Sequence, residues 1–167
     1  MPMILRPPRP DDEAALRRMH AEMAAEHFDV LLAEGTWDEI LAEIAREAAG
    51  TDLPRGRVRA DFLVAEVDGE VVGRVSIRHS LTPFLHDIGG HVGYGVAPEH
   101  RRRGYATEML RLSVERLAGL GVEEVLVTCD DDNRGSAKVI EACGGVLEDV
   151  RPVPYGVPKR RYWITAR

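Results

Sequence analysis

The stretch Gly90-His-Val-Gly-Tyr-Gly-Val-Ala-Pro-Glu-His-Arg-Arg-Arg-Gly-Tyr-Ala-Thr-Glu-Met-Leu-Arg-Leu-Ser113 decides the fold, because it predicts a strand, a basic loop and a helix in direct succession. Residues 91–96 form the predicted strand, and they include Gly93 and Gly95. Glycine suits a strand interior where the strand bulges or where another molecule approaches the backbone. Pro98 ends the pairing because it has no N–H, and beyond the loop the apolar residues recur at the spacing of one helix face.

The loop from Arg101 to Ala106 carries three arginines and a glycine just before the helix begins. The first turn of a helix has backbone N–H groups without partners and a partial positive charge. Gly104 and Ala106 leave these groups uncovered, and the arginines add positive charge to a chain whose formal net charge is −6. The loop therefore predicts a phosphate or pyrophosphate site, with an exposed basic turn as the alternative.

A length of 167 residues predicts one domain, residues 1–167, that is large enough to bury its own core. A composition of 44% hydrophobic and 30% charged residues excludes a disordered chain. No apolar stretch has the length of a membrane helix, and residues 1–4 lack the apolar core of a signal peptide, so we expect no membrane contact and a cytoplasmic location. The acidic balance argues against a nucleic-acid partner. Cys129 and Cys143 are expected to be small core residues instead of nucleophiles or a disulfide.

Periodicity and turn signals predict the element order β, α, α, β, β, β, α, β, α, β, β along the chain. Thr36 and Glu39 form a capping box at the start of the second helix. Asp68-Gly69 is the pair that a type I′ turn prefers, and it joins the arms of a hairpin over residues 61–78. In the second arm of this hairpin, one face is expected to lie in the core and the other to be at least partly exposed to solvent. The remaining strands are expected at residues 3–6, 124–129, 146–150 and 161–165, and the remaining helices begin near Asp11 and after Asn133.

This order, together with Arg101-x-x-Gly104-x-Ala106 after a glycine-bearing strand, resembles the GCN5-related N-acetyltransferases (the GNAT superfamily) over nearly the whole chain. A P-loop would need Gly-Lys-Ser/Thr and a dinucleotide fold would need Gly-x-Gly-x-x-Gly, and the sequence has neither. The nearer resemblance is to a bacterial subgroup of predicted acetyltransferases, and it rests on Arg78-His79-Ser80-Leu81, Gly89-Gly90-His91-Val92-Gly93-Tyr94, Cys129-Asp130, Asp132-Asn133, Ile140-Glu141, Gly144-Gly145 and Arg161-Tyr162-Trp163. It implies an α/β (α+β) GNAT fold, with a mixed central sheet of about six to seven strands and helices on both faces.

The resemblance also implies that acetyl-CoA is the acyl donor, and it suggests which residues bind it. A backbone N–H near Val96 would bind the thioester oxygen as that oxygen gains charge. Asn133 can equally cap the helix that follows it. The implied donor site consists of Tyr94, Gly95, Val96, Arg101, Arg102, Arg103, Gly104, Tyr105, Ala106, Thr107, Asn133 and Ser136.

The acid and the base are less clearly marked. The family often has a tyrosine seven residues after the asparagine, serving as the acid toward the departing thiolate, but here that position is Ile140. Tyr94, Tyr105 or water would take over, and Ile140→Tyr is expected to keep or raise activity.

For the base, His91 is favoured over His79 because imidazole titrates near working pH, and the central strand holds no carboxylate. Water, Glu66 or Glu99 comes next. Residues 130–132 are read as partners of a helix N-terminus, so no metal is expected.

The chain is therefore predicted to be an N-acetyltransferase that moves acetyl from acetyl-CoA to a primary amine by direct attack. The alternative is a catalytically silent acyl-CoA-binding sensor or regulatory module, which the missing tyrosine and the uncertain base keep open. The acceptor is expected to be a small-molecule or peptide amine. A homodimer is left open.

Overall fold

Two antiparallel sheets carry the fold. In the computed structural model, which describes residues 2–166, the larger sheet has the order β1-β2-β3-β4, with β1 (Met3–Arg6), β2 (Ala60–Val67), β3 (Glu70–Arg78) and β4 (Val92–Val96). The smaller sheet has the order β5-β7-β6, with β5 (Glu124–Asp130), β6 (Val146–Arg151) and β7 (Lys159–Thr165). The helices are α1 (Glu13–Ala24), α2 (Trp37–Ala49), α3 (Tyr105–Gly119) and α4 (Arg134–Ala142), with the short turns η1 (Pro10–Asp12), η2 (Leu85–Gly89) and η3 (Pro98–His100).

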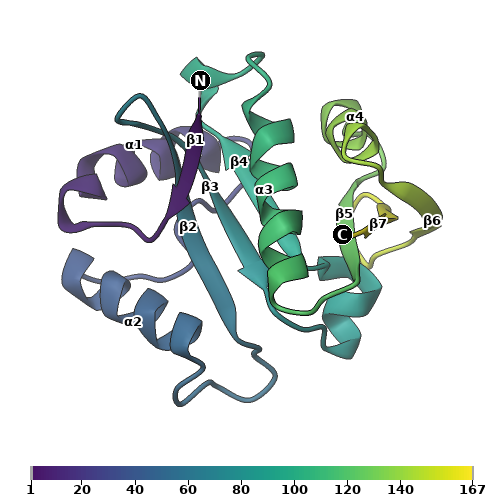
Figure 1. Cartoon of the computed structure of the whole chain (residues 1–167), viewed down its shortest axis with the longest axis horizontal. Helices are drawn as coiled ribbons and strands as arrows, with labels where there is room; N and C mark the ends of the chain where they lie inside the picture. The colour runs from purple at the N-terminus through teal and green to yellow at the C-terminus, as the bar shows by residue number, and fades with distance from the viewer. Residues whose placement is uncertain (1, 167) are drawn as a thin grey trace.

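The predicted order of strands and helices is confirmed. Helices α1 and α2 lie on one face of the larger sheet, α3 lies on the other, and α4 accompanies the smaller sheet (Figure 1). The alternation along β2 explains the layers, because Phe62 and Val64 pack with α1 and α2 whereas Leu63 and Ala65 pack with α3. None of the helices within residues 2–166 has the length and apolar character to cross a membrane.

Two local signals form as predicted. At the start of α2, Thr36 Oγ1 accepts from the N–H of Glu39 and the Glu39 carboxylate accepts from the N–H of Thr36, each at 3.2 Å. Between β2 and β3, Asp68 and Gly69 both have positive φ, 52° and 80°, as a type I′ turn requires. Both features depend on residues close in sequence, so they need no tertiary help.

The predicted single central sheet is divided in two beside β4. His91 joins the two sheets: its N–H donates to Leu126 O (2.7 Å), and its ring Nδ1 accepts from the N–H of Leu126 (2.9 Å). Beyond this junction no ladder connects β4 with β5 among the residues described. The strands therefore open away from His91, and a ligand can enter between them.

The face of β3 that carries Arg74 and Ser76 was expected to be partly exposed to solvent, but these residues are buried. Arg74 and Ser76 are each 4% exposed. The Arg74 guanidinium donates to the carbonyls of Asp29 (2.6 Å), Val30 (3.0 Å) and Gly93 (3.3 Å), and burial lowers its pKa to about 9. The connection between α1 and α2 is thus held down on this face, which corrects the prediction.

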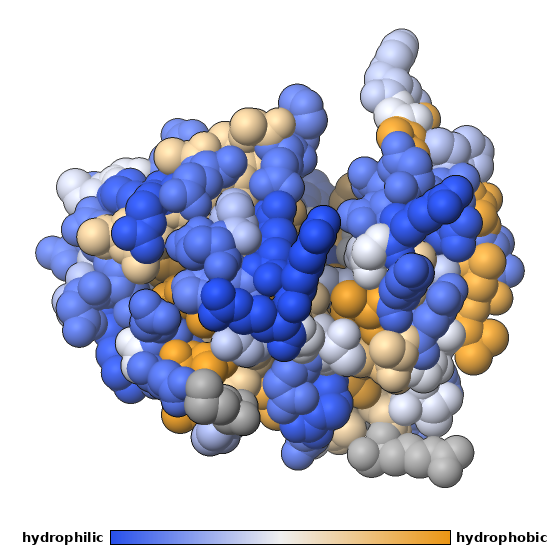
Figure 2. Space-filling view, turned by 90° about the horizontal axis from the view of Figure 1, so that it is seen from above, coloured by the Kyte–Doolittle hydropathy of each residue, from blue (hydrophilic) through white to orange (hydrophobic). Residues whose placement is uncertain are grey.

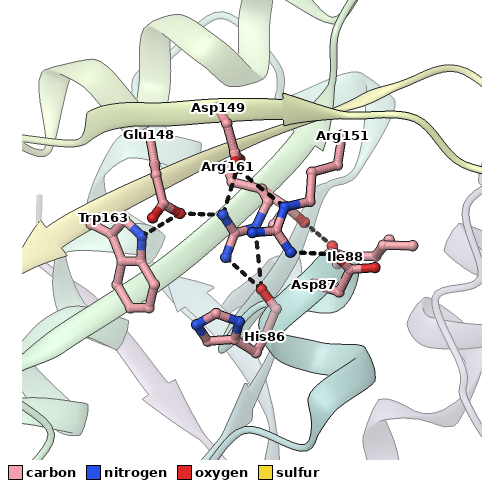
Figure 3. Close-up of polar contacts among 9 residues, drawn as sticks. His86, Asp87, Ile88, Glu148, Asp149, Arg151, Arg161 and Trp163 are labelled. Atoms are coloured by element: carbon pink, nitrogen blue, oxygen red, sulfur yellow. Dashed lines mark hydrogen bonds and ion pairs between the residues drawn. The ribbon is translucent and has the colours of Figure 1, made fainter.

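A second buried arginine holds η2 against the smaller sheet (Figure 3). Arg161 on β7 donates to the carbonyl of His86 at 2.7 and 3.1 Å and pairs with Asp149 (2.9 Å) and Glu148. Thr128 on β5 adds a bond from its hydroxyl to the carbonyl of Ile88 (2.6 Å). We call this set, together with Arg151 and Asp87, the Arg161 clamp. It ties the segment before β4 to β5, β6 and β7.

Candidate functional site

The opening between the two sheets forms a groove of about 540 Å³. It lies where β4 ends and where α3 and α4 begin. All of the predicted donor residues except Arg103 line it: Tyr94, Gly95, Val96, Arg101, Arg102, Gly104, Tyr105, Ala106, Thr107, Asn133 and Ser136. Figure 2 looks onto this end of the molecule and shows a hollow beside a dense group of hydrophilic side chains. We call it the donor groove.

One end of the donor groove is the start of α3. Gly104 is the N-cap with φ 79°, no side chain caps the helix, and a Cβ at this glycine would meet nothing within 4 Å. The first backbone N–H groups of α3 therefore face open space, which suits an anion. Arg101 is held in place here, because it donates to Val96 O (3.2 Å) and pairs with Glu26 (2.9 and 3.0 Å).

The edge of β4 faces the middle of the groove with free N–H groups. Arg78 N donates to His91 O, and Ala97 N donates to Val72 O, so the odd-numbered residues of β4 bond to β3. Because N–H directions alternate along a strand, the N–H groups of Tyr94 and Val96 point to the opposite edge.

The glycines of β4 do not mark a bulge against β3. The register runs without a shift from the Gly73–Val96 pair to the Ile77–Val92 pair. Close packing explains Gly95 instead, since a Cβ there would lie 2.7 Å from the ring of Phe28. The expectation of a bulge is therefore corrected for this ladder.

Two polar side chains join across the donor groove. The Tyr94 hydroxyl lies 2.9 Å from Ser136 Oγ, which links β4 to α4. Burial raises the Tyr94 pKa to about 12, so the phenol stays protonated at neutral pH and is able to donate to a nearby anion. Asn133 caps α4 by accepting from the N–H of Ser136 (3.0 Å), which confirms the capping alternative.

Ile140 does not line the donor groove. Its side chain is fully buried in the core shared by α3, α4 and the sheets, against Gly145, whose Cβ position lies 2.5 Å from Ile140 Cγ2. A tyrosine has no room here. The expectation that Ile140→Tyr keeps activity is therefore withdrawn.

The two histidines predicted as bases lie outside the lining of the donor groove. His91 is 4% exposed and accepts at Nδ1, so its ring proton is on Nε2, and burial lowers its pKa to about 4. His79 bonds through Nε2 to Asp61 (2.9 Å), which also accepts from Arg116 Nε (2.8 Å). The base role of either residue stays a prediction, and the geometry of His91 weighs against it.

The other candidates for chemistry are engaged elsewhere. Burial raises the pKa of both Cys129 and Cys143, whose thiols are free. Asp130 pairs with Lys159, and Asp131 pairs with Arg160 (2.7 Å), so both acids bind β7. The prediction had placed them at the start of α4. No group of three potential metal ligands occurs in the part of the chain that the structure describes.

Sequence reasoning missed a second groove, which lies on the face of the larger sheet that α2 covers. Two adjoining hollows of about 430 and 480 Å³ form it. They share the lining residues Leu32, Glu47, Arg57, Ala60 and Ser76, and we call them together the α2 groove. Its walls come from α2, β2, β3 and the connection that precedes η2, so no single stretch of sequence reveals it. The only local signal is a serine between two arginines on one face of β3.

Residues 3–146 match the family model described as an acetyltransferase (GNAT) domain. Among solved structures, RimJ of Mycobacterium smegmatis in complex with CoA-disulfide is similar at 22% identity and a TM-score of 0.76, over 98% of this chain and 82% of that one.

YncA, a putative acetyltransferase from Salmonella typhimurium with acetyl-CoA, has 18% identity and a TM-score of 0.68, over 99% and 94% of the two chains. Spermidine N-acetyltransferase from Vibrio cholerae in complex with CoA and spermine has 16% identity and a TM-score of 0.70, over 98% and 95%. At these identities the likeness shows the fold.

Proposed function

Because the chain belongs to the acetyltransferase (GNAT) family, we propose that it transfers acetyl from acetyl-CoA to a primary amine by direct attack. One observation carries the proposal: the donor groove runs from the uncapped start of α3 along the free edge of β4. The start of α3 is a site for an anion, and the edge of β4 is a row of hydrogen-bond donors for an extended arm. A molecule with a pyrophosphate and a long amide chain has both features.

The donor would lie with its pyrophosphate at Gly104 and its arm along β4. The arm cannot pass His91, because the bond from His91 N to Leu126 O closes the opening there. The thioester would therefore lie between Val96 and His91. An N–H of Tyr94 or Val96 would bind its oxygen as the oxygen gains charge during attack.

In the reaction, the lone pair of the amine attacks the thioester carbon, a C–N bond forms and the C–S bond breaks. The thiolate leaves with the electron pair of that bond, and the nitrogen releases its proton to water. Tyr94 is protonated at neutral pH and is the side chain best placed to donate a hydrogen bond to the departing sulfur. Thiolate is a fair leaving group, since a thiol has a pKa of about 8.5.

A catalytically silent acyl-CoA sensor remains the second candidate, on one specific observation. Within residues 2–166, the only carboxylate that lines the donor groove is Glu26, and it is paired with Arg101. An enzyme without a side-chain base would rely on ordered water and on the free amine present at higher pH.

The two candidates are separated by titrating the protein with acetyl-CoA in a calorimeter and then measuring thiol release across a panel of amines. The proposed enzyme binds and turns over, whereas a sensor binds without turnover. A protein that binds neither acetyl-CoA nor CoA would refute both. Dephospho-CoA is the control ligand for CoA. It keeps the pyrophosphate and the arm that the groove would hold, so it should bind as well.

A further inference from the structure

The α2 groove has an apolar floor. Leu31, Ile40 and Phe62 line its first hollow, and Phe84 and Leu85 line the second. At the rim two large apolar side chains are open to solvent, because Leu32 is 49% and Phe84 is 65% exposed. A surface of this kind favours a ligand with an apolar body.

Ser76 is the polar exception on this floor. It lines both hollows and is 4% exposed, yet its hydroxyl makes no hydrogen bond to any other group among the residues described. Among the residues described, the buried side-chain polar atom without a partner is His100 Nδ1, so Ser76 Oγ is still reached by water from the groove. A ligand with an N–H or a lone pair would take the place of that water. The position of Ser76 thus indicates a polar atom of the ligand at this point.

Ser76 also lies beside the predicted place of the thioester. In the ladder it is the partner of Gly93, two residues before Gly95, and directly opposed residues lie about 5 Å apart. Gly93 has no side chain of its own on this face, and the Arg74 guanidinium lies beside it, 3.8 Å from the place of a Cβ. Farther along β4 the face is closed, because the ring of Phe28 covers Gly95 and stacks on Arg74, with 4.5 Å from the guanidinium to the ring centre. A nucleophile on this face would therefore reach β4 past Ser76.

Most of the charged groups that line the α2 groove are engaged with one another or with the backbone. Glu43 pairs with Arg46, Glu47 pairs with Arg57 (3.1 Å), and Glu39 caps α2. Glu34 and Arg78 are left without an ion-pair partner among the residues described, and Arg78 donates to the carbonyls of Gly89 and Gly90 instead (3.0 Å each). Glu34 can attract one cation, whereas the charge of Arg78 disfavours a second. The floor offers no carboxylate for a second ammonium group. One amine with an apolar body fits this distribution, and a polyamine does not.

We propose that the α2 groove binds the acceptor, a monoamine with an apolar body, and that Ser76 orients its nitrogen toward the thioester beside Gly93. This inference rests on the proposed acetyl transfer. Ser76 acts by hydrogen bonding to the reacting nitrogen, and the apolar floor holds the rest of the molecule. An alkylamine and a peptide with an apolar first residue offer the same chemistry.

The test measures thiol release from acetyl-CoA with butylamine, hexylamine and 2-(2-aminoethoxy)ethanol, a polar amine of nearly the same length as hexylamine. Each buried methylene should raise kcat/KM by about fourfold, so hexylamine, with two more methylenes, should exceed butylamine by about fifteenfold and should clearly exceed the ether amine. A short peptide amide that begins with phenylalanine, compared with one that begins with glycine, tells which source of the amine is preferred.

Ser76→Ala should lower kcat/KM for hexylamine by about tenfold, while the affinity for acetyl-CoA in the calorimeter stays unchanged. Ser76→Thr keeps the hydroxyl and should retain most of the activity. Ser113→Ala is the matched control: Ser113 is fully buried on α3, donates to Met109 O (2.7 Å) and lines neither groove, so it should leave kcat/KM unaltered.

The inference is overturned if hexylamine is no better than the ether amine, or if Ser76→Ala matches Ser113→Ala. It is also overturned if the protein loaded with acetyl-CoA neither binds nor acetylates hexylamine. These results leave the proposed function standing as long as acetyl-CoA binds and some amine releases thiol. Failure to bind acetyl-CoA would instead remove the proposed function, and this inference with it.

Discussion

Replacing His91 should reduce the loss of unfolding free energy that acid causes between about pH 6.5 and about pH 4. The ring is buried at the junction of the two sheets and accepts a backbone hydrogen bond, so burial lowers its pKa from 6.5 to about 4. At a pH between these values the unfolded chain binds a proton that the native protein does not bind. The contribution of His91 to the free energy of unfolding is therefore complete above pH 6.5, and it is lost as the pH falls toward about 4. A difference of about 2.5 pH units corresponds to about 3 kcal/mol of unfolding free energy.

The assay is urea unfolding of the wild type and of His91→Asn at a series of pH values from about 7 to about 4. Asparagine keeps an acceptor for the N–H of Leu126 but has no titrating group. All other ionisable groups are shared, so they cancel in the difference between the two proteins. The wild type should lose about 3 kcal/mol more than the variant across this range.

Equal pH dependence in the two proteins would refute the reasoning, because it would mean that His91 titrates alike in the folded and unfolded states. Turnover provides an independent reading. A base role predicts that His91→Asn loses activity at neutral pH and recovers it as pH rises. A structural role predicts that the variant keeps its turnover wherever it is folded.

Three further predictions concern the donor groove and the core beside it. Gly104→Glu puts a carboxylate at the start of α3 where there is open space, so the fold should persist while calorimetry shows a loss of acetyl-CoA affinity of about a hundredfold; Gly104→Asn, which tolerates positive φ, is the uncharged control that should keep binding. Tyr94→Phe should lower kcat by about tenfold with donor affinity kept, and since the pKa of Tyr94 is about 12, the ratio of the two kcat values should stay constant between about pH 7 and pH 9; a ratio that changes over this range would contradict a protonated phenol. Ile140→Tyr should lower the free energy of unfolding by about 2 kcal/mol in urea, whereas Ile140→Val should cost about 1 kcal/mol, and a tyrosine variant as stable as wild type would show that the core has room.

Features that depend on neighbours in sequence could be predicted. The capping box of Thr36 and Glu39 and the Asp68-Gly69 turn are built from residues at most three apart, and each formed as expected. The positively charged loop before α3 belongs to the same class, since Gly104 follows directly on the arginines. Short-range backbone rules decide such elements, whatever the remainder of the chain does.

Features that depend on distant partners could not. His91 was singled out for its titration range, but its role at the junction is set by Leu126, 35 residues later. Arg161 is buried because a carbonyl 75 residues earlier faces it. On β3, alternation suggested that Arg74 and Ser76 face water, and only the connection between α1 and α2 decides that they do not. Periodicity shows that two faces differ, but it does not show what covers each one.

The order β5-β7-β6 of the smaller sheet has a consequence during synthesis. The middle strand is the one that the ribosome makes last of the three, so β5 and β6 have no partner until β7 has emerged. The larger sheet, by contrast, is complete once residue 96 is out. Until β7 has emerged, the nascent chain exposes the edges of β5 and β6, which can pair with other chains. The wall of the donor groove that α4 provides therefore gains its support only when the ribosome has released residues 159–165.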